Sequence, residues 1–246
     1  METLYIKPQE LEKGFIGGGD EGCVYRYNNQ YAVKIFNSYY DKEKRMENKM
    51  AKVKELMKIQ DPSFAFPMGL VTTNGKTENG YYTKYIAGRR SFRHLSLEMN
   101  REKILKVLLE AEAALKRIHK RGIIVGDLKE ENILLNRGNH PVFIDTDNYI
   151  CGKHPFDLLP LRVGCLYDLY GGKMIRFEDN DKLLFALMSL EMLTKDPRFK
   201  YGASREDIAQ AIKTYSKNKE VREVLSAIFS NAEEKPYVGS VLQKVI

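Results

Sequence analysis

Residues 125–135 read Val-Gly-Asp-Leu-Lys-Glu-Glu-Asn-Ile-Leu-Leu, and this stretch carries the most specific signal in the chain. Asp127 and Asn132 lie five residues apart on a predicted loop, where they can divide two tasks. The carboxylate of Asp127 can orient and deprotonate an attacking hydroxyl, and the amide oxygen of Asn132 can bind Mg²⁺. Lys129 can place positive charge on a phosphoryl group during its transfer. The stretch is therefore a candidate catalytic loop, and the alternative is a polar surface turn after a helix.

A second acidic segment follows thirteen residues after Asn132. The apolar run Val142-Phe143-Ile144 predicts a short strand that ends in Asp145-Thr146-Asp147. Because carboxylates are preferred ligands of hard cations, Asp145 is predicted to bind the metal together with Asn132. Asp147 has two possible roles at this point, as a second carboxylate for Mg²⁺ or as the cap of a turn.

A glycine-rich segment lies near the N-terminus. Residues 17–24 fit the pattern G-x-G-x-x-G-x-V, in which missing side chains let backbone N–H groups approach phosphate oxygens. A strand follows the motif, whereas the Rossmann fingerprint and the Walker phosphate loop need a helix there. Taken alone, the motif also fits a simple glycine-rich hairpin turn.

Lys34 ends the segment Ala32-Val33-Lys34 inside the predicted strand 31–36. By strand alternation Lys34 faces the same side as Ala32, so a small residue leaves room for a flat base while the lysine reaches phosphate. A cation in a cleft needs an acidic partner to hold it in place, and helix geometry favours Glu47 over its rival Glu43. Both acids border an apolar stripe on the following helix, formed by Met46, Met50, Val53 and Met57.

The order of the predicted elements indicates an α+β fold. Strands broken by turns, with one inserted helix, fill residues 1–86, and mainly helical segments fill residues 87–246. The segment 101–120 is amphipathic, 181–194 is apolar nearly all round, and Ser204-x-x-Asp207 is typical of a capping box. The apolar face of the segment 101–120 is formed by Ile104, Leu108, Ala111, Leu115 and Ile118.

The composition argues against a protein that binds nucleic acid or spans a membrane. The 246 residues carry a net charge of +7, but the lysines alternate with acids along helical stretches and no nucleic-acid-binding motif accompanies them. No apolar segment is long enough to span a bilayer. The three cysteines are widely spaced, as expected in a reduced compartment. We therefore expect a cytoplasmic protein that binds neither nucleic acid nor membrane.

These motifs, in this order, resemble the protein kinase superfamily over most of the chain, and most closely its eukaryotic-type Ser/Thr kinases. The resemblance implies a small β-rich N-lobe with one main helix, a larger helical C-lobe, and ATP and Mg²⁺ as ligands. Asp127, Lys129 and Asn132 match the catalytic loop, Asp145 matches the metal-binding aspartate, and Lys34 matches the lysine that anchors phosphate. Lys34, Asp127, Asn132 and Asp145 are expected to converge around a triphosphate in the groove between the lobes.

The resemblance also implies an adenine site. Residues 84–88 resemble the hinge, so adenine is expected to bond to the carbonyl of Lys84 and the amide of Ile86, with Thr83 as gatekeeper. The residues expected to hold the nucleotide are Gly17, Gly19, Gly22, Val24, Ala32, Lys34, Thr83, Lys84, Ile86 and Leu134. Among these, Val24, Ala32 and Leu134 would enclose the adenine. Asp181 resembles the aspartate that braces the catalytic loop.

Several positions depart from the family pattern. Val125-Gly126 replaces the usual His-Arg before the base, Thr146-Asp147 replaces Phe-Gly, and no Ala-Pro-Glu precedes the helix of Asp181. Lys235 replaces the arginine that would pair with the glutamate of that motif. The first change implies that no arginine clamps a phosphorylated activation loop.

Three functions follow from these patterns. The first is a Ser/Thr protein kinase that acts on itself or on a partner protein. The second is a small-molecule kinase of the aminoglycoside or choline type, which Gly126 before the base favours. The third is a pseudokinase that binds nucleotide without transferring phosphate.

Overall fold

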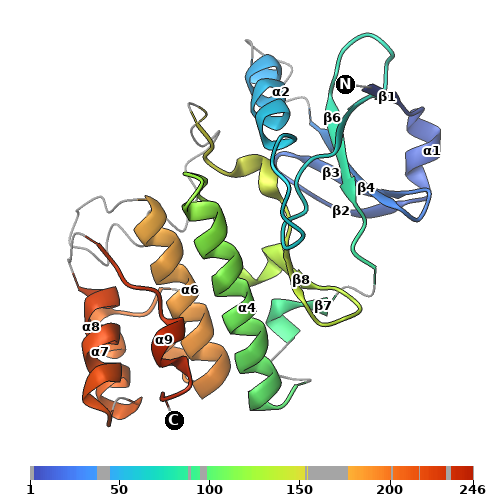
Figure 1. Cartoon of the computed structure of the whole chain (residues 1–246). Coiled ribbons are helices and arrows are strands. Elements are labelled where there is room, and N and C mark those ends of the chain that lie inside the picture. The colour runs from blue at the N-terminus through green and yellow to red at the C-terminus, as the bar shows by residue number, and fades with distance from the viewer. Residues whose placement is uncertain are drawn as a thin grey trace. The chain divides into compact units, whose positions relative to one another are not determined.

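The computed structural model describes residues 3–37, 45–87, 90–94, 99–152, 154, 177–200, 202–215, 217–230 and 234–245. The chain divides into two compact units. Unit 1 contains Met1–Arg89 and Val142–Asp147, and unit 2 contains Arg90–Pro141 and Asn148–Ile246. The N-terminal part is rich in β-strands and the C-terminal part is helical (Figure 1). The predicted α+β fold class is therefore confirmed.

Unit 1 is built on a six-stranded sheet with the order β1-β5-β6-β4-β3-β2. Its strands are β1 (Thr3–Tyr5), β2 (Phe15–Gly19), β3 (Gly22–Tyr27), β4 (Tyr31–Phe36), β5 (Gly69–Thr72) and β6 (Gly80–Lys84). In β4, Lys34 pairs with Val24 on one side and Tyr81 on the other, and Ala32 pairs with Thr83. Because directly paired residues share a face of the sheet, these five side chains lie on one face.

Helix α2 (Arg45–Leu56) packs on the same face of the sheet. Met50 and Val53 are buried against Phe36, Leu70 and Tyr81, with Met46 and Met57 partly buried beside them. The predicted apolar stripe is confirmed. On the opposite face, the short helix α1 (Pro8–Glu12) contributes Leu11 to a second cluster with Ile6, Val33 and Val71.

Residues 142–147 return the chain to unit 1, although the sequence placed them in the C-terminal part. The N–H of Phe143 donates to the carbonyl of Ser63 at 2.8 Å, and the N–H of Ala65 donates to the carbonyl of Phe143 at 2.8 Å. The ring of Phe143 stacks on Phe64 with centroids 4.7 Å apart. Hydrogen bonds and ring stacking together hold this segment in unit 1.

The core of unit 2 forms around α4 (Arg101–His119) and α6 (Phe177–Thr194). All five residues of the predicted apolar face of α4 are buried, and α6 is buried nearly all round, as expected. The other elements are β7 (Arg90–Ser91), η2 (Phe92–His94), η3 (Glu130–Asn132), β8 (Ile133–Leu135), β9 (Pro141–Phe143), η4 (Thr146–Asn148), η5 (Pro197–Phe199), α7 (Arg205–Tyr215), α8 (Lys219–Phe229) and α9 (Gly239–Leu242). Of these, β9 and η4 cross the boundary between the units.

Side-chain caps fix the starts of α4 and α7 in unit 2. The side chain of Asn100 accepts the N–H of Lys103 at 3.0 Å at the start of α4. Ser204 accepts the N–H of Asp207 at 3.1 Å and donates its hydroxyl to the Asp207 carboxylate at 2.8 Å. The predicted cap is thus present. Within the part of the chain that the structure describes, no helix combines the length and apolarity needed to cross a membrane.

Candidate active site

The glycine-rich segment forms the hairpin of β2 and β3, in which Gly17 pairs with Val24 and Gly19 with Gly22. A Cβ atom on Gly22 would lie 2.2 Å from the carbonyl oxygen of Ile35, so only glycine lets this strand lie so close to β4. A Cβ on Gly17 or Gly19 would meet nothing within 4 Å. The backbone at these two positions is therefore uncovered on its Cβ side, as a loop that covers phosphate requires.

Gly22 and Gly19 are expected to respond differently to substitution by alanine. Gly22→Ala should lower the free energy of unfolding by about 2 kcal/mol, because the added methyl group clashes with backbone rather than a flexible side chain. Gly19→Ala serves as the matched control and should leave the free energy of unfolding nearly unchanged. Urea unfolding of both variants measures the difference. Equal stability of the two would contradict the packing role of Gly22.

Lys34 is buried in unit 1, where its ammonium group contacts three carboxylates. It donates to Asp145 Oδ1 at 2.6 Å, to Glu21 Oε2 at 3.1 Å, and to both oxygens of Asp147 at 3.0 and 3.1 Å. Burial by itself would lower the pKa of Lys34, but the charges of Asp147 and Asp145 outweigh this effect and hold the pKa well above its ordinary value. Lys34 is therefore a fixed cation.

Asp147 is the fully buried member of this group. Besides its contacts with Lys34, Asp147 accepts a hydrogen bond from the hydroxyl of Tyr81 at 2.6 Å. It also forms an ion pair with Lys49 of α2 at 2.8 Å. Burial alone would raise the pKa of Asp147, yet the charges of Lys34 and Lys49 hold it far below its ordinary value. Asp147 is therefore ionised, and its contacts are to two cations and a phenol.

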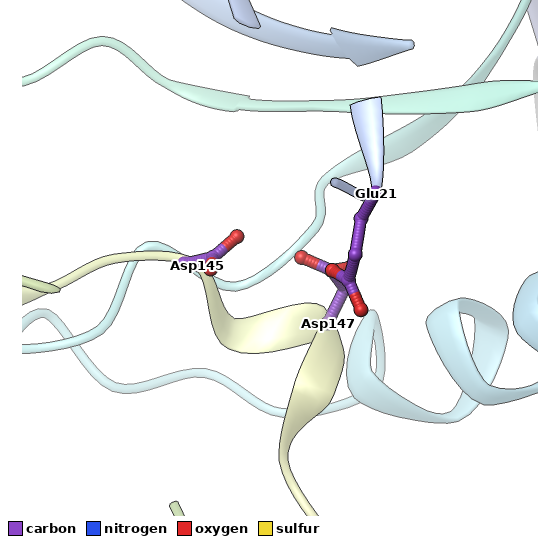
Figure 2. Close-up of side chains that lie close together, drawn as sticks. All are labelled: Glu21, Asp145 and Asp147. Atoms are coloured by element: carbon purple, nitrogen blue, oxygen red, sulfur yellow. The ribbon is translucent and has the colours of Figure 1, made fainter. Parts of the chain in front are cut away.

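Glu21, Asp145 and Asp147 bring oxygen atoms within 4.8 Å of one another (Figure 2). Carboxylate oxygens are preferred ligands of Mg²⁺. Of the two aspartates, Asp145 is the more accessible to an ion, because its side chain is 32% exposed and that of Asp147 is 0% exposed. Asp145 also adopts a positive φ of 58°, a left-handed conformation that aspartate tolerates better than most residues. These residues fit a magnesium ion bound through Asp145.

Glu47, predicted as the partner of Lys34, is exposed near the start of α2. It is not among the carboxylates that contact Lys34 within the described ranges. The inward face of the helix carries Lys49, Met50 and Val53, which leaves residue 47 on the outer side. Its rival Glu43 lies outside the described residues.

Three of the residues predicted to lie around the adenine, Val24, Ala32 and Thr83, lie on the sheet face that carries Lys34. Val24 and Ala32 are half-buried there, and the hydroxyl oxygen of Thr83 is buried with no hydrogen-bond partner among the described residues. Because a buried hydroxyl without a partner is unfavourable, Thr83 provides a polar atom that a bound molecule can satisfy. In the segment predicted as the hinge, Lys84 is exposed and Ile86 half-buried.

The predicted catalytic loop lies in unit 2. Lys129 donates to Asp127 Oδ2 at 2.6 Å, and both side chains are partly exposed. The Asn132 amide nitrogen faces the Asp127 carbonyl at 3.5 Å, a contact that does not use the amide oxygen needed for a metal. Leu134 is half-buried on β8. The structure thus brings Asp127, Lys129 and Asn132 together, while their convergence with Lys34 and Asp145 stays a prediction.

Asp181 of α6 holds the backbone of this loop through hydrogen bonds. Its carboxylate accepts the N–H groups of Val125 and Gly126, both at 2.8 Å, and lies 2.9 Å from Nε2 of His119. Gly126 has a φ of 74°, a conformation that glycine adopts easily and the family's usual arginine does not. The backbone immediately before Asp127 is therefore fixed by a buried carboxylate.

Glu21, Lys49 and Tyr81 are site residues that the sequence reasoning missed. A usable signal existed for Lys49, since Met46, Lys49, Met50 and Val53 follow the i, i+3, i+4, i+7 spacing of an inward helix face. Glu21 lies at a variable position of the glycine motif, and Tyr81 is one of several strand tyrosines. Neither of these positions carries a sequence signal of its own.

Comparison with known protein families gives a match to the protein kinase domain over residues 11–146, which is more than half of the chain. The chain belongs to the protein kinase family. The match spans the glycine-rich hairpin, Lys34, the loop of Asp127 and Asp145. It supports a kinase-type phosphotransferase.

As a member of this family, the chain departs from the usual pattern at Lys235. This residue is buried, its N–H donates to Asp179 Oδ1 at 3.1 Å, and its ammonium group donates to the carbonyl of Ser230 at 2.6 Å. Lys235 therefore ties the last segment of unit 2 to the start of α6. The region where the Ala-Pro-Glu motif would occur lies largely outside the described residues.

Proposed function

We propose that this protein kinase is an ATP-dependent Ser/Thr kinase that transfers the γ-phosphate to a protein hydroxyl, with Asp127 as the catalytic base. The observation that carries the proposal is the Asp127–Lys129 pair, held at 2.6 Å on a loop whose backbone Asp181 fixes. A carboxylate and a cation side by side suit the deprotonation of a hydroxyl next to a phosphoryl group.

In this proposal, four residues of unit 1 take part in binding ATP. Gly17 and Gly19 leave backbone uncovered for phosphate, Lys34 supplies a fixed positive charge, and Thr83 offers a hydroxyl at the predicted adenine site. Asp145 and Asn132 would hold Mg²⁺, which neutralises charge on the phosphates when bound. In this mechanism Asp127 accepts the proton of the attacking hydroxyl, while Lys129 faces the transferred group.

A small-molecule kinase is the second candidate. Gly126 immediately precedes the base, and its φ of 74° is a conformation that the family's usual arginine would adopt only with strain. Enzymes that phosphorylate aminoglycosides or choline often have glycine at this position, as the resemblance noted above implies. The acceptor would then be a sugar or an alcohol in place of a protein.

The acceptor is identified by incubating the full chain with γ-labelled ATP and Mg²⁺, alone and with a cell extract, and mapping all phosphorylated sites. We expect label on serine or threonine of this chain or of an extract protein. ATP consumption stimulated only by an aminoglycoside or choline would replace the first proposal with the second. Nucleotide binding without any turnover would identify a pseudokinase.

A further inference from the structure

We infer that Asp147 is the residue that positions Lys34 and that Lys49 and Tyr81 hold Asp147 in place. The inference rests on the proposed function, because it concerns the lysine that would bind the phosphates of ATP. It assigns to Asp147 and Lys49 the task expected of Glu47, an exposed residue.

The contacts of Asp147 leave no position for a metal ion. An ionised carboxylate offers about four acceptor sites. Oδ1 accepts from Lys34 at 3.0 Å and from Tyr81 at 2.6 Å, while Oδ2 contacts Lys34 at 3.1 Å and Lys49 at 2.8 Å. All four sites are used, and the side chain is 0% exposed. Asp147 therefore acts on Lys34, and Asp145 remains the carboxylate that is open to a cation.

Lys49 is suited to hold Asp147 and unsuited to contact a ligand directly. Its side chain is 0% exposed, and its ammonium group also donates to the carbonyl oxygen of Asp147 at 3.3 Å. The same group lies 5.3 Å from the centre of the Phe36 ring, on the sheet face that α2 covers. Helix α2 thus contributes a cation that orients a carboxylate, and the carboxylate in turn orients Lys34.

The charges around Asp147 predict how the thermal stability of three variants should differ. Asp147→Asn leaves Lys49 buried beside a neutral group and should lower Tm by roughly 10 °C. The double variant Asp147→Asn with Lys49→Met removes both charges and should regain most of that loss. Asp147→Asn with Lys52→Met is the matched control, because Lys52 is equally buried on the same helix. This control should regain nothing.

Kinetic measurements then show whether Asp147 positions Lys34 for the reaction or only stabilises the fold. In the double Asp147/Lys49 variant we expect kcat to fall about 100-fold, since a displaced Lys34 no longer meets the phosphate correctly. The Mg²⁺ concentration that gives half-maximal rate should stay at the wild-type value, whereas Asp145→Asn should raise it. Lys52→Met should lower Tm and leave kcat unchanged.

Binding of a fluorescent ATP analogue, measured without Mg²⁺, provides a readout that does not need turnover. The double variant should bind the analogue about 10-fold more weakly than wild type, because an oriented lysine is lost from the phosphate site. Unchanged binding and unchanged kcat in a folded double variant would overturn the inference, as would a raised Mg²⁺ requirement. Failure of the proposed function looks different, because the wild type itself would then transfer no phosphate.

Discussion

Replacing Asp127 with Asn is expected to lower kcat for phosphate transfer by about 1,000-fold, because the amide keeps the shape of the side chain but cannot accept the proton. The Kd for ATP should stay at the wild-type value, since Asp127 contacts the acceptor hydroxyl in the proposed mechanism. Transfer of labelled γ-phosphate measures the rate, and calorimetry measures binding. Asp207→Asn, on the exposed start of α7, is a control for the loss of a carboxylate elsewhere.

Retention of labelling in Asp127→Asn would contradict the assignment of the base. A loss of ATP binding together with transfer would instead place Asp127 in the nucleotide site. Only a low kcat with an unchanged Kd supports the proposed role.

Asp181→Ala is expected to lower the free energy of unfolding by about 4 kcal/mol, because it leaves several buried hydrogen-bond donors without an acceptor. The donors are the N–H groups of Val125 and Gly126 and, in the matching tautomer, Nε2 of His119. Transfer activity should fall as well, since the loop that carries Asp127 loses its support. Urea unfolding measures the free energy, and the labelling assay measures activity.

Asp181→Asn is the matched variant for this experiment. Its amide oxygen can still accept the N–H of Gly126, and its amide nitrogen, placed where Oδ2 lies, can donate to His119 if the imidazole changes tautomer. The N–H of Val125 then loses its acceptor. The loss of stability should therefore be clearly smaller than in Asp181→Ala. Equal losses in the two variants would show that the size of the side chain matters and that its hydrogen bonds do not.

The sequence predicted those parts of the molecule that follow from local spacing. The stripe on α2 and the apolar face of α4 follow the helical period, and the cap at Ser204 follows from a four-residue pattern. The motif order around Asp127 identified the family. The helical stripes, the cap and each single motif lie within about twenty residues, a range over which periodicity and motif spacing are informative, and the order of the motifs from Gly17 to Asp145 adds the family.

The partner of Lys34 could not be predicted in this way. Its contacts with Asp145 and Asp147 join residues more than 100 positions apart, and they exist because residues 142–147 pack against the segment of Phe64. The helical period predicts which residues of α2 share a face. It does not predict whether the charged residue that faces the sheet pairs with a cation or with an anion. The expectation that the lysine needs an acid from the helix therefore led to Glu47, while the helix supplies Lys49.

The return of Val142–Asp147 to unit 1 has a consequence for dividing this protein into fragments. A polypeptide ended at residue 89 would keep every strand of the six-stranded sheet, yet Phe64 would lose its stacking contact with the ring of Phe143. Lys34 and Lys49 would lose Asp147, and Lys34 would also lose Asp145, so two buried ammonium groups would lose carboxylates that they contact, while Glu21 would remain beside both. Unit 1 is thus not a separable module, because the charge balance around its buried lysines depends on residues 142–147, which are synthesised much later.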